Sequence, residues 1–139
     1  MLRFYPSLLV SLLIALSASA VVTIDWLPVE NPGNPCDTQA QGCFGAVAHR
    51  YQISKYEVTN AQYAEFLNAV AATDTNLLYN TDMGSSIHGG ITQSCSLSCT
   101  YSVISGRENM PVNYVSFFDA LRFANWMNNG QSSGDTEPW

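Results

Sequence analysis

Basic residues are scarce in this chain of 139 residues, which has five Lys and Arg against eleven Asp and Glu and a formal net charge of −6. A surface with so few cations offers no basic face to phosphates, so we expect no nucleic-acid partner. The same deficit argues against docking on anionic lipid. An acidic balance of this size is typical of a surface that keeps an exported protein soluble.

The sequence also lacks the common catalytic signatures: it has no G-x-S-x-G elbow, H-E-x-x-H pair, P-loop or EF-hand loop. Asp74, Asp82 and Glu108 are isolated in sequence, which predicts solvated side chains. His88, in "IHGG", has no nucleophile or carboxylate beside it, which disfavours a functional role. His49 falls on the apolar side of an alternating stretch and is predicted to be a hydrogen-bonded core residue rather than a ligand.

The longest apolar run is confined to the start of the chain. Residues 1–20 have one Arg, an apolar stretch from Leu8 to Leu16, and an Ala18-Ser19-Ala20 ending. This pattern predicts a secretory signal peptide, because the stretch is short for the alternative, a membrane anchor. Cleavage after Ala20 leaves 139 − 20 = 119 residues, room for one domain, with no stable membrane insertion expected. We therefore predict an exported protein: periplasmic, extracellular or at the cell surface.

Four cysteines follow the predicted cleavage point: Cys36, Cys43, Cys95 and Cys99. An even count in an exported chain predicts disulfides, for which three connectivities are possible. Sequence proximity favours Cys36–Cys43 and Cys95–Cys99, and each bond is expected to stabilise only modestly because it closes a short loop. A zinc site is the alternative, which the C-x6-C and C-x3-C spacings and the distant histidines disfavour.

Two segments carry the signals of capped amphipathic helices. Thr59 and Gln62 make a T-x-x-Q capping box, which predicts a helix from Asn60 to about Ala72. Its apolar stripe recurs at helical spacing and consists of Tyr63, Phe66, Leu67 and Val70. Ser116 and Asp119 begin the second predicted helix, which ends at Asn128-Asn129-Gly130.

The second helix is apolar over much of its circumference. Its predicted face consists of Phe117, Ala120, Leu121, Ala124 and Met127, with Phe118 and Trp126 at the margins. A helix of this kind needs cover on more than one side. The polar tail at 131–139 does not supply that cover, so Trp126 is expected to need neighbours that the chain does not encode. We expect exposed apolar surface, strong dye binding and a poorly cooperative melt.

The remaining segments read as strands and loops. One strand is predicted at Val21–Leu27, followed by a loop rich in Pro, Gly and Cys, and a second strand over Phe44–Ile53. The apolar face of the second strand is Val47, His49, Tyr51 and Ile53. Between 73 and 106 we expect an ordered surface loop closed by the second cysteine pair, ending in a short strand at Thr100–Ile104. The predicted divisions are 21–45, an N-terminal strand and loop; 46–130, a domain; and 131–139, a truncated polar tail.

Two blocks of sequence match a known family. "YQISKYEVTNAQYAEFLNAV" and "MPVNYVSFFDALRFANWMN" resemble the start of the sulfatase-modifying-factor domain, the family of the formylglycine-generating enzyme. The matching features are "YEVTNAQY-x-x-F" at Tyr56–Phe66, "PV-x-x-V-S" at Pro111–Ser116 and "DA-x-x-F-x-x-W" at Asp119–Trp126. The two blocks have the family's order and separation, and the resemblance covers about Ala46 to Asn129.

The resemblance implies an α+β, C-type-lectin-like fold, incomplete in this chain, with two amphipathic helices, few short strands and long loops. Known members oxidise a cysteine of a sulfatase to formylglycine, using oxygen and a copper ion held by two cysteines, and carry structural calcium. Those ligands lie beyond the second block, so no catalytic, cofactor-binding or metal residue is assigned in this chain. Cys95 and Cys99 precede that block and are not matched to the copper pair.

The resemblance leaves two functions open. One is a fragment, inactive by itself, of an exported enzyme of the formylglycine-generating type, with a sulfatase-like protein as substrate of the full-length protein. The other is a non-catalytic extracellular binding or surface module on the same fold. A complete small domain is disfavoured by the exposed apolar surface expected on the second helix.

Overall fold

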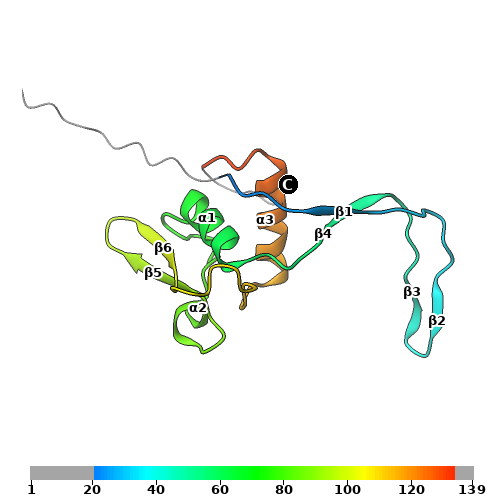
Figure 1. Cartoon of the computed structure of the whole chain (residues 1–139), viewed down its shortest axis with the longest axis horizontal. Helices are drawn as coiled ribbons and strands as arrows, with labels where there is room; N and C mark the ends of the chain where they lie inside the picture. The colour runs from blue at the N-terminus through cyan, green and yellow to red at the C-terminus, as the bar shows by residue number, and fades with distance from the viewer. Residues whose placement is uncertain (1–20, 134–139) are drawn as a thin grey trace, which may run out of the picture.

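The computed structural model describes residues 21–133, so the predicted signal peptide at 1–20 and the end of the predicted tail, 134–139, lie outside the described residues. The chain forms a body of helices and one hairpin, from which a two-stranded arm extends (Figure 1). The elements are β1 (Trp26–Val29), β2 (Asp37–Gln39), β3 (Gly42–Phe44), β4 (Tyr51–Ser54), α1 (Asn60–Val70), α2 (Asp82–Ser85), β5 (Ile91–Cys95), β6 (Cys99–Val103) and α3 (Phe117–Asn128).

The arm is an antiparallel ribbon of β1 and β4, with a β2–β3 hairpin at its far end (Figure 1). The first strand is shifted from the predicted Val21–Leu27, and the predicted strand at Phe44–Ile53 is interrupted, because 45–50 form no strand. Alternation still places Leu27 and its partner Ile53 on one face of the ribbon. No second layer covers that face among the described residues, so both side chains are about half exposed.

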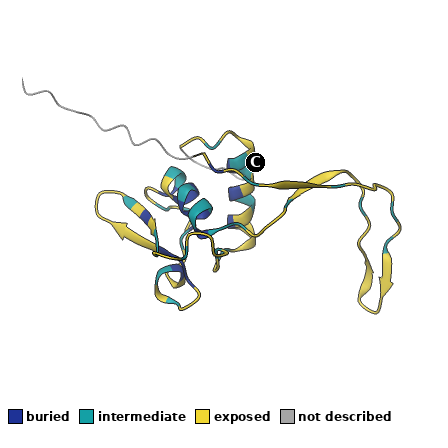
Figure 2. Cartoon of the chain, in the orientation of Figure 1, coloured by how far each residue is buried: buried dark blue, intermediate teal, exposed yellow. Residues whose placement is uncertain are grey.

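The prediction that His49 is a core residue is wrong. The structure exposes His49, as it does most of the arm (Figure 2). An alternating apolar pattern predicts buried side chains only where one face of the sheet packs against another layer. Among the described residues, no such layer covers the ribbon of β1 and β4.

Helix α1 begins where its capping box predicts. The backbone N–H of Gln62 donates to Thr59 Oγ1 at 3.2 Å, and the Thr59 N–H donates to Gln62 Oε1 at 2.9 Å. The helix ends at Val70, two residues before the predicted end. Tyr63, Phe66 and Leu67 of the predicted stripe are buried, and Phe66 and Leu67 are fully enclosed. Each such side chain contributes about 1.5–3 kcal/mol through the removal of apolar area from water.

The hairpin of β5 and β6 occupies residues 91–103 of the segment between 73 and 106 that was predicted to be mostly loop. It pairs Ile91 with Val103 and ends at the Cys95–Cys99 disulfide. β6 is close to the predicted strand at Thr100–Ile104, whereas β5 and α2 were not predicted. Only Ile91 and Tyr101 of the hairpin are buried, and β6 packs against α1. One buried residue per strand among Ser and Thr gives too weak an alternation to predict the pair from sequence.

Helix α3 forms its predicted capping box but packs through a different face. The Asp119 N–H donates to Ser116 Oγ at 3.2 Å, and the Ser116 N–H donates to Asp119 Oδ2 at 3.1 Å. The buried residues are Asp119, Phe123 and Trp126, whereas Phe117, Ala120 and Ala124 of the predicted face are exposed. The aromatic rings decide the orientation, because Phe66 of α1 meets both Phe123 and Trp126 at centroid distances of 5.4 and 5.3 Å.

The prediction that Trp126 would lack neighbours within the chain is wrong. Its side chain is 4% exposed, and its Nε1–H donates to the Ser132 carbonyl at 3.1 Å. The described residues therefore enclose the indole themselves, contrary to the prediction that they could not. Apolar surface is instead exposed at the start of the helix, where Phe117 and Phe118 are 72% and 63% exposed.

Candidate functional site

The two motif blocks are joined at the start of α1. Thr59 and Pro111 form an isolated bridge, and the Val112 N–H donates to the Val58 carbonyl at 2.9 Å. Asn60 is 2% exposed, and its side-chain amide donates to the Arg107 carbonyl at 2.9 Å. Gly90 approaches so closely that a Cβ there would lie 2.2 Å from the Asn60 amide nitrogen. Blocks separated by about 50 residues thus form one buried corner.

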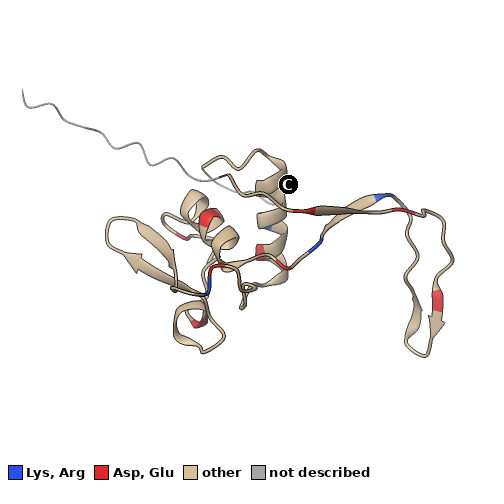
Figure 3. Cartoon of the chain, viewed as in Figure 1, with Lys and Arg blue, Asp and Glu red and all other residues tan. Residues whose placement is uncertain are grey.

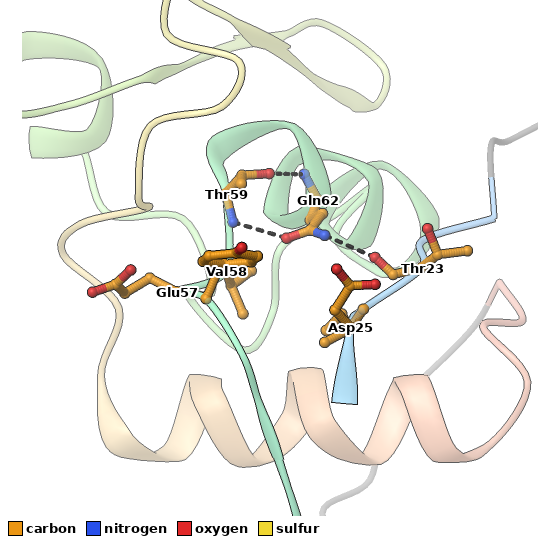
Figure 4. Close-up of a pocket in the computed structure, with 8 residues that line it drawn as sticks. Thr23, Asp25, Glu57, Val58, Thr59 and Gln62 are labelled. Carbon is orange, nitrogen blue, oxygen red and sulfur yellow. Dashed lines mark hydrogen bonds between the residues drawn. The ribbon is translucent and has the colours of Figure 1, made fainter. Parts of the chain in front are cut away.

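A hollow of about 250 Å³ lies beside this corner (Figure 4). Gln62 forms one wall, where its side-chain amide donates to the Thr23 carbonyl at 2.8 Å and so joins the N-terminal segment to α1. Asp25 and Glu57 are at the rim and point in different directions (Figure 4). The hollow has no nucleophile and no paired acids, so its hydrogen bonds indicate a structural role.

An apolar groove of about 230 Å³ lies between the base of the arm and α3. We call it the α3 groove; it is lined by Ile24, Trp26, Ser54, Val58, Tyr63, Val112, Val115, Ala120, Phe123, Ala124 and Met127. Ala120, Ala124 and Met127 belong to the apolar face predicted for this helix. Ala120 and Ala124 are exposed and Met127 packs only against the margin of the core, so this face borders an open groove.

A larger and more polar cleft, of about 750 Å³, lies at the N-terminal end of α3. We call it the Arg122 cleft; it is lined by Asn76, Leu77, Tyr79, Asn80, Thr81, Tyr114, Ser116, Phe118, Asp119 and Arg122. The sequence singled out Ser116 and Asp119 as helix caps only. Arg122 went unnoticed because a lone arginine on an amphipathic helix is normally a solvated residue.

Asp74 holds one wall of this cleft and is only partly exposed, whereas a solvated side chain was predicted. Its carboxylate accepts the backbone N–H groups of Leu78 at 2.7 Å and Tyr79 at 3.2 Å. Burial raises the pKa of Asp74, although these two hydrogen bonds act in the opposite direction. Asp82 and Glu108 are exposed, as predicted for isolated acids, and His88 is exposed too.

Tyr63 ties this wall to the core. Its hydroxyl donates to the Leu78 carbonyl at 3.1 Å, and both residues are 1% exposed. Burial raises the pKa of Tyr63 strongly, and the negative charges of Asp119 and Asp74 add to this effect. The tyrosine is therefore a neutral, hydrogen-bonded core residue at neutral pH.

All four cysteines are oxidised: Cys36 is bonded to Cys43 and Cys95 to Cys99, as sequence proximity favours. The first bond lies in the β2–β3 hairpin of the arm, and the second closes the β5–β6 hairpin. A copper ion held by two cysteines needs thiolates, which disulfide sulfurs do not supply. The donor set of this chain therefore does not fit the copper site that the family resemblance implies.

The described residues also form no cluster of acidic side chains that could bind calcium. Within residues 21–133, no group of three or more His, Cys, Asp or Glu side chains could hold a metal ion. Calcium prefers six to eight oxygen ligands, so the described residues do not fit the implied calcium site.

These observations define a disulfide-bonded α+β domain with two capped helices and one buried corner between them. A scan against protein-family models matches residues 40–134 to the sulfatase-modifying factor enzyme 1-like domain. Because the match covers more than half of the chain, the chain belongs to this family. Both sequence blocks and the corner that they form lie inside the matched range. Comparisons with curated proteins and with solved structures give no match.

In the part of the chain from 21 to 133, no helix is long and apolar enough to cross a bilayer.

Proposed function

We propose that this chain forms a non-catalytic part of an exported protein of the sulfatase-modifying-factor type, with a C-type-lectin-like arrangement. Its residues provide the scaffold around the Asn60 corner and binding surface beside it, and its cysteines have a structural role. The observation that carries the proposal is the pairing of all four cysteines in disulfides. Oxidation of a substrate cysteine in the manner of the family's enzymes would need thiolates from elsewhere.

Export is part of the proposal. Two disulfides are typical of chains that fold in an oxidising compartment, and the family match is compatible with such a location. The predicted signal peptide at 1–20 supports the same conclusion on independent grounds. A fusion of residues 1–20 to a reporter would test it, since export of the reporter is expected and retention with an uncleaved leader would contradict it.

The catalytic question has a direct test. The mature chain is incubated with oxygen, copper and a sulfatase-derived peptide that contains a cysteine, and the aldehyde product is trapped with a hydrazide and measured by mass spectrometry. We expect no aldehyde above the peptide-only control. Cys95→Ser/Cys99→Ser and Cys36→Ser/Cys43→Ser double variants serve as controls. Aldehyde formation by the wild-type chain that either double variant abolishes would overturn the proposal.

The α3 groove favours the second function, a binding module that holds a peptide without oxidising it. Nearly all of its lining is apolar, and several of its residues lie on an exposed helix face. The same peptide with serine in place of cysteine should then bind without reaction. An Ala124→Arg substitution fills the groove and should abolish binding, whereas Asn129→Arg, beyond the groove, should not. Equal binding by both variants would exclude this function.

A further inference from the structure

We propose that the Arg122 cleft binds a carboxylate group that is attached to an apolar group. The proposal goes beyond the scaffold function, because it concerns a separate cleft and does not depend on the state of the cysteines.

The first observation is the state of the guanidinium. Arg122 Nε is fully buried and has no hydrogen-bond partner. Among the described residues, no hydrogen bond or ion pair reaches Arg122, although the side chain as a whole is partly exposed and lines the cleft. A buried donor without a partner is costly, and natural proteins retain few of them. A carboxylate in the cleft that pairs with the exposed end of the guanidinium would neutralise its charge and so lower the cost of keeping the group partly buried.

Asp119 would be the obvious partner for Arg122, one helical turn away, but it is already engaged. Its carboxylate accepts the Ser116 N–H at 3.1 Å as part of the capping box, and it is 8% exposed. The positive end of the helix therefore stabilises Asp119. Arg122 is left as the only cationic side chain among the residues that line the cleft.

The opposite wall is held in an unusual conformation. Leu77 has a φ of 54° and Asp74 a φ of 45°, values that non-glycine residues rarely adopt. Tyr114, which lines the cleft from the segment just before α3, has a φ of 64°. Three of the five positive-φ non-glycine residues in the described part thus shape this cleft. Backbone strain of this kind concentrates at binding sites, where the surrounding structure fixes the chain before the ligand arrives.

The chemistry of the rim defines the rest of the ligand. Leu77 and Phe118 are 79% and 63% exposed, and both line the cleft. The guanidinium fork matches a carboxylate, and the apolar rim suits an aliphatic or aromatic group next to it. Two sources share this chemistry: a small organic acid, and the C-terminal carboxylate of a peptide that ends in an apolar residue.

Matched ligands test the proposal on the mature chain. Phenylacetate and its neutral analogue phenylacetamide are titrated while nuclear magnetic resonance follows the Arg122 Nε–H signal and the backbone amide signals of the cleft loop at 76–81, which remain observable in the Arg122 variants. We expect saturable shifts with phenylacetate and at least about tenfold weaker binding of the amide, because a charge-assisted pair is lost. The tripeptide Gly-Gly-Phe and its C-terminal amide form the second arm. Binding of the acid in that arm identifies a peptide source, and binding of phenylacetate alone identifies a small molecule.

Variants separate recognition from folding. Arg122→Gln should lose binding, and Arg122→Lys should weaken it because the charge remains without the fork. Arg50→Gln removes a cation from the exposed arm and should change nothing. Phe118→Ala should weaken binding of phenylacetate through the apolar half of the site. Equal affinity for acid and amide, no saturable shift with any of the four ligands, or wild-type affinity in folded Arg122→Gln would each overturn the proposal.

Discussion

At the scale of single residues, the corner between the two motif blocks explains the sequence pattern best. Thr59 caps α1 and forms a bridge to Pro111, so one position joins the start of the helix to the second block. Asn60 fills the space that Gly90 leaves by having no side chain. The residues that identify the family are therefore those that hold the corner together, and none of the bonds described there involves a reacting group.

Loss of the α1 cap should be measurable in isolation. Thr59→Ala removes the acceptor for the Gln62 N–H and should lower the free energy of unfolding by about 1 kcal/mol. Thr75→Ala, at an exposed loop position, is the matched control and should stay within about 0.5 kcal/mol of wild type. Urea denaturation measures both. Equal stability of the two variants would mean that the cap contributes nothing.

Tyr63 should couple stability to alkaline pH. Its pKa is raised in the folded protein, so above the ordinary value of 10.0 the folded state keeps a proton that the unfolded state releases. Stability must therefore fall as pH rises through about 10 and beyond. Tyr63→Phe should cost about 1–3 kcal/mol at neutral pH, because the buried Leu78 carbonyl loses its donor.

The variant should also lose less stability than wild type between neutral and alkaline pH. Chemical denaturation at matched pH values measures the difference. An alkaline slope that is identical in the two proteins would contradict the assigned role of Tyr63.

At the scale of elements, the two long helices could be predicted from the sequence, whereas the bounds of most strands and the short helix α2 could not. Capping boxes are local, so Thr59, Gln62, Ser116 and Asp119 marked both helix starts. The buried face of α3 was missed because the choice between Phe123 and Phe117 depends on Phe66, a distant residue. The Arg122 cleft could not be predicted either, because the loop at 76–81 and α3 are distant in sequence and become neighbours only when the chain folds.

The two disulfides should contribute unequally. The β5–β6 hairpin packs on α1, so Cys95→Ser/Cys99→Ser should lower the stability of the body by about 2 kcal/mol. The β2–β3 hairpin makes no extensive contact with the body, so Cys36→Ser/Cys43→Ser should leave the main thermal transition in place. Calorimetry of the two double variants tests this, and equal shifts of the transition would show that the arm and the body unfold together.

At the scale of the whole molecule, burial divides the described residues into two parts. The buried residues gather in the body, and the arm is largely exposed on both faces (Figure 2). The few Lys and Arg residues are scattered along the described chain and do not gather on one side of it (Figure 3). A two-stranded ribbon has little stability of its own, so the arm should open locally without unfolding of the body.

Hydrogen exchange should resolve these two parts. Amides of β1 and β4 are expected to exchange much faster than those of α1, whose side chains form the core. Mass spectrometry of peptides from the two regions measures the difference. Equal protection of the ribbon and α1 would show that something covers the arm in solution.

A count of free thiols tests the central claim most directly. The mature chain, exported and purified without reductant, is denatured and treated with a thiol reagent. If the cysteines are structural, no reactive thiol should appear before reduction and four should appear after it. Two or more reactive thiols before reduction would contradict the account, because the chain could then supply the thiolate pair that the proposed function denies it.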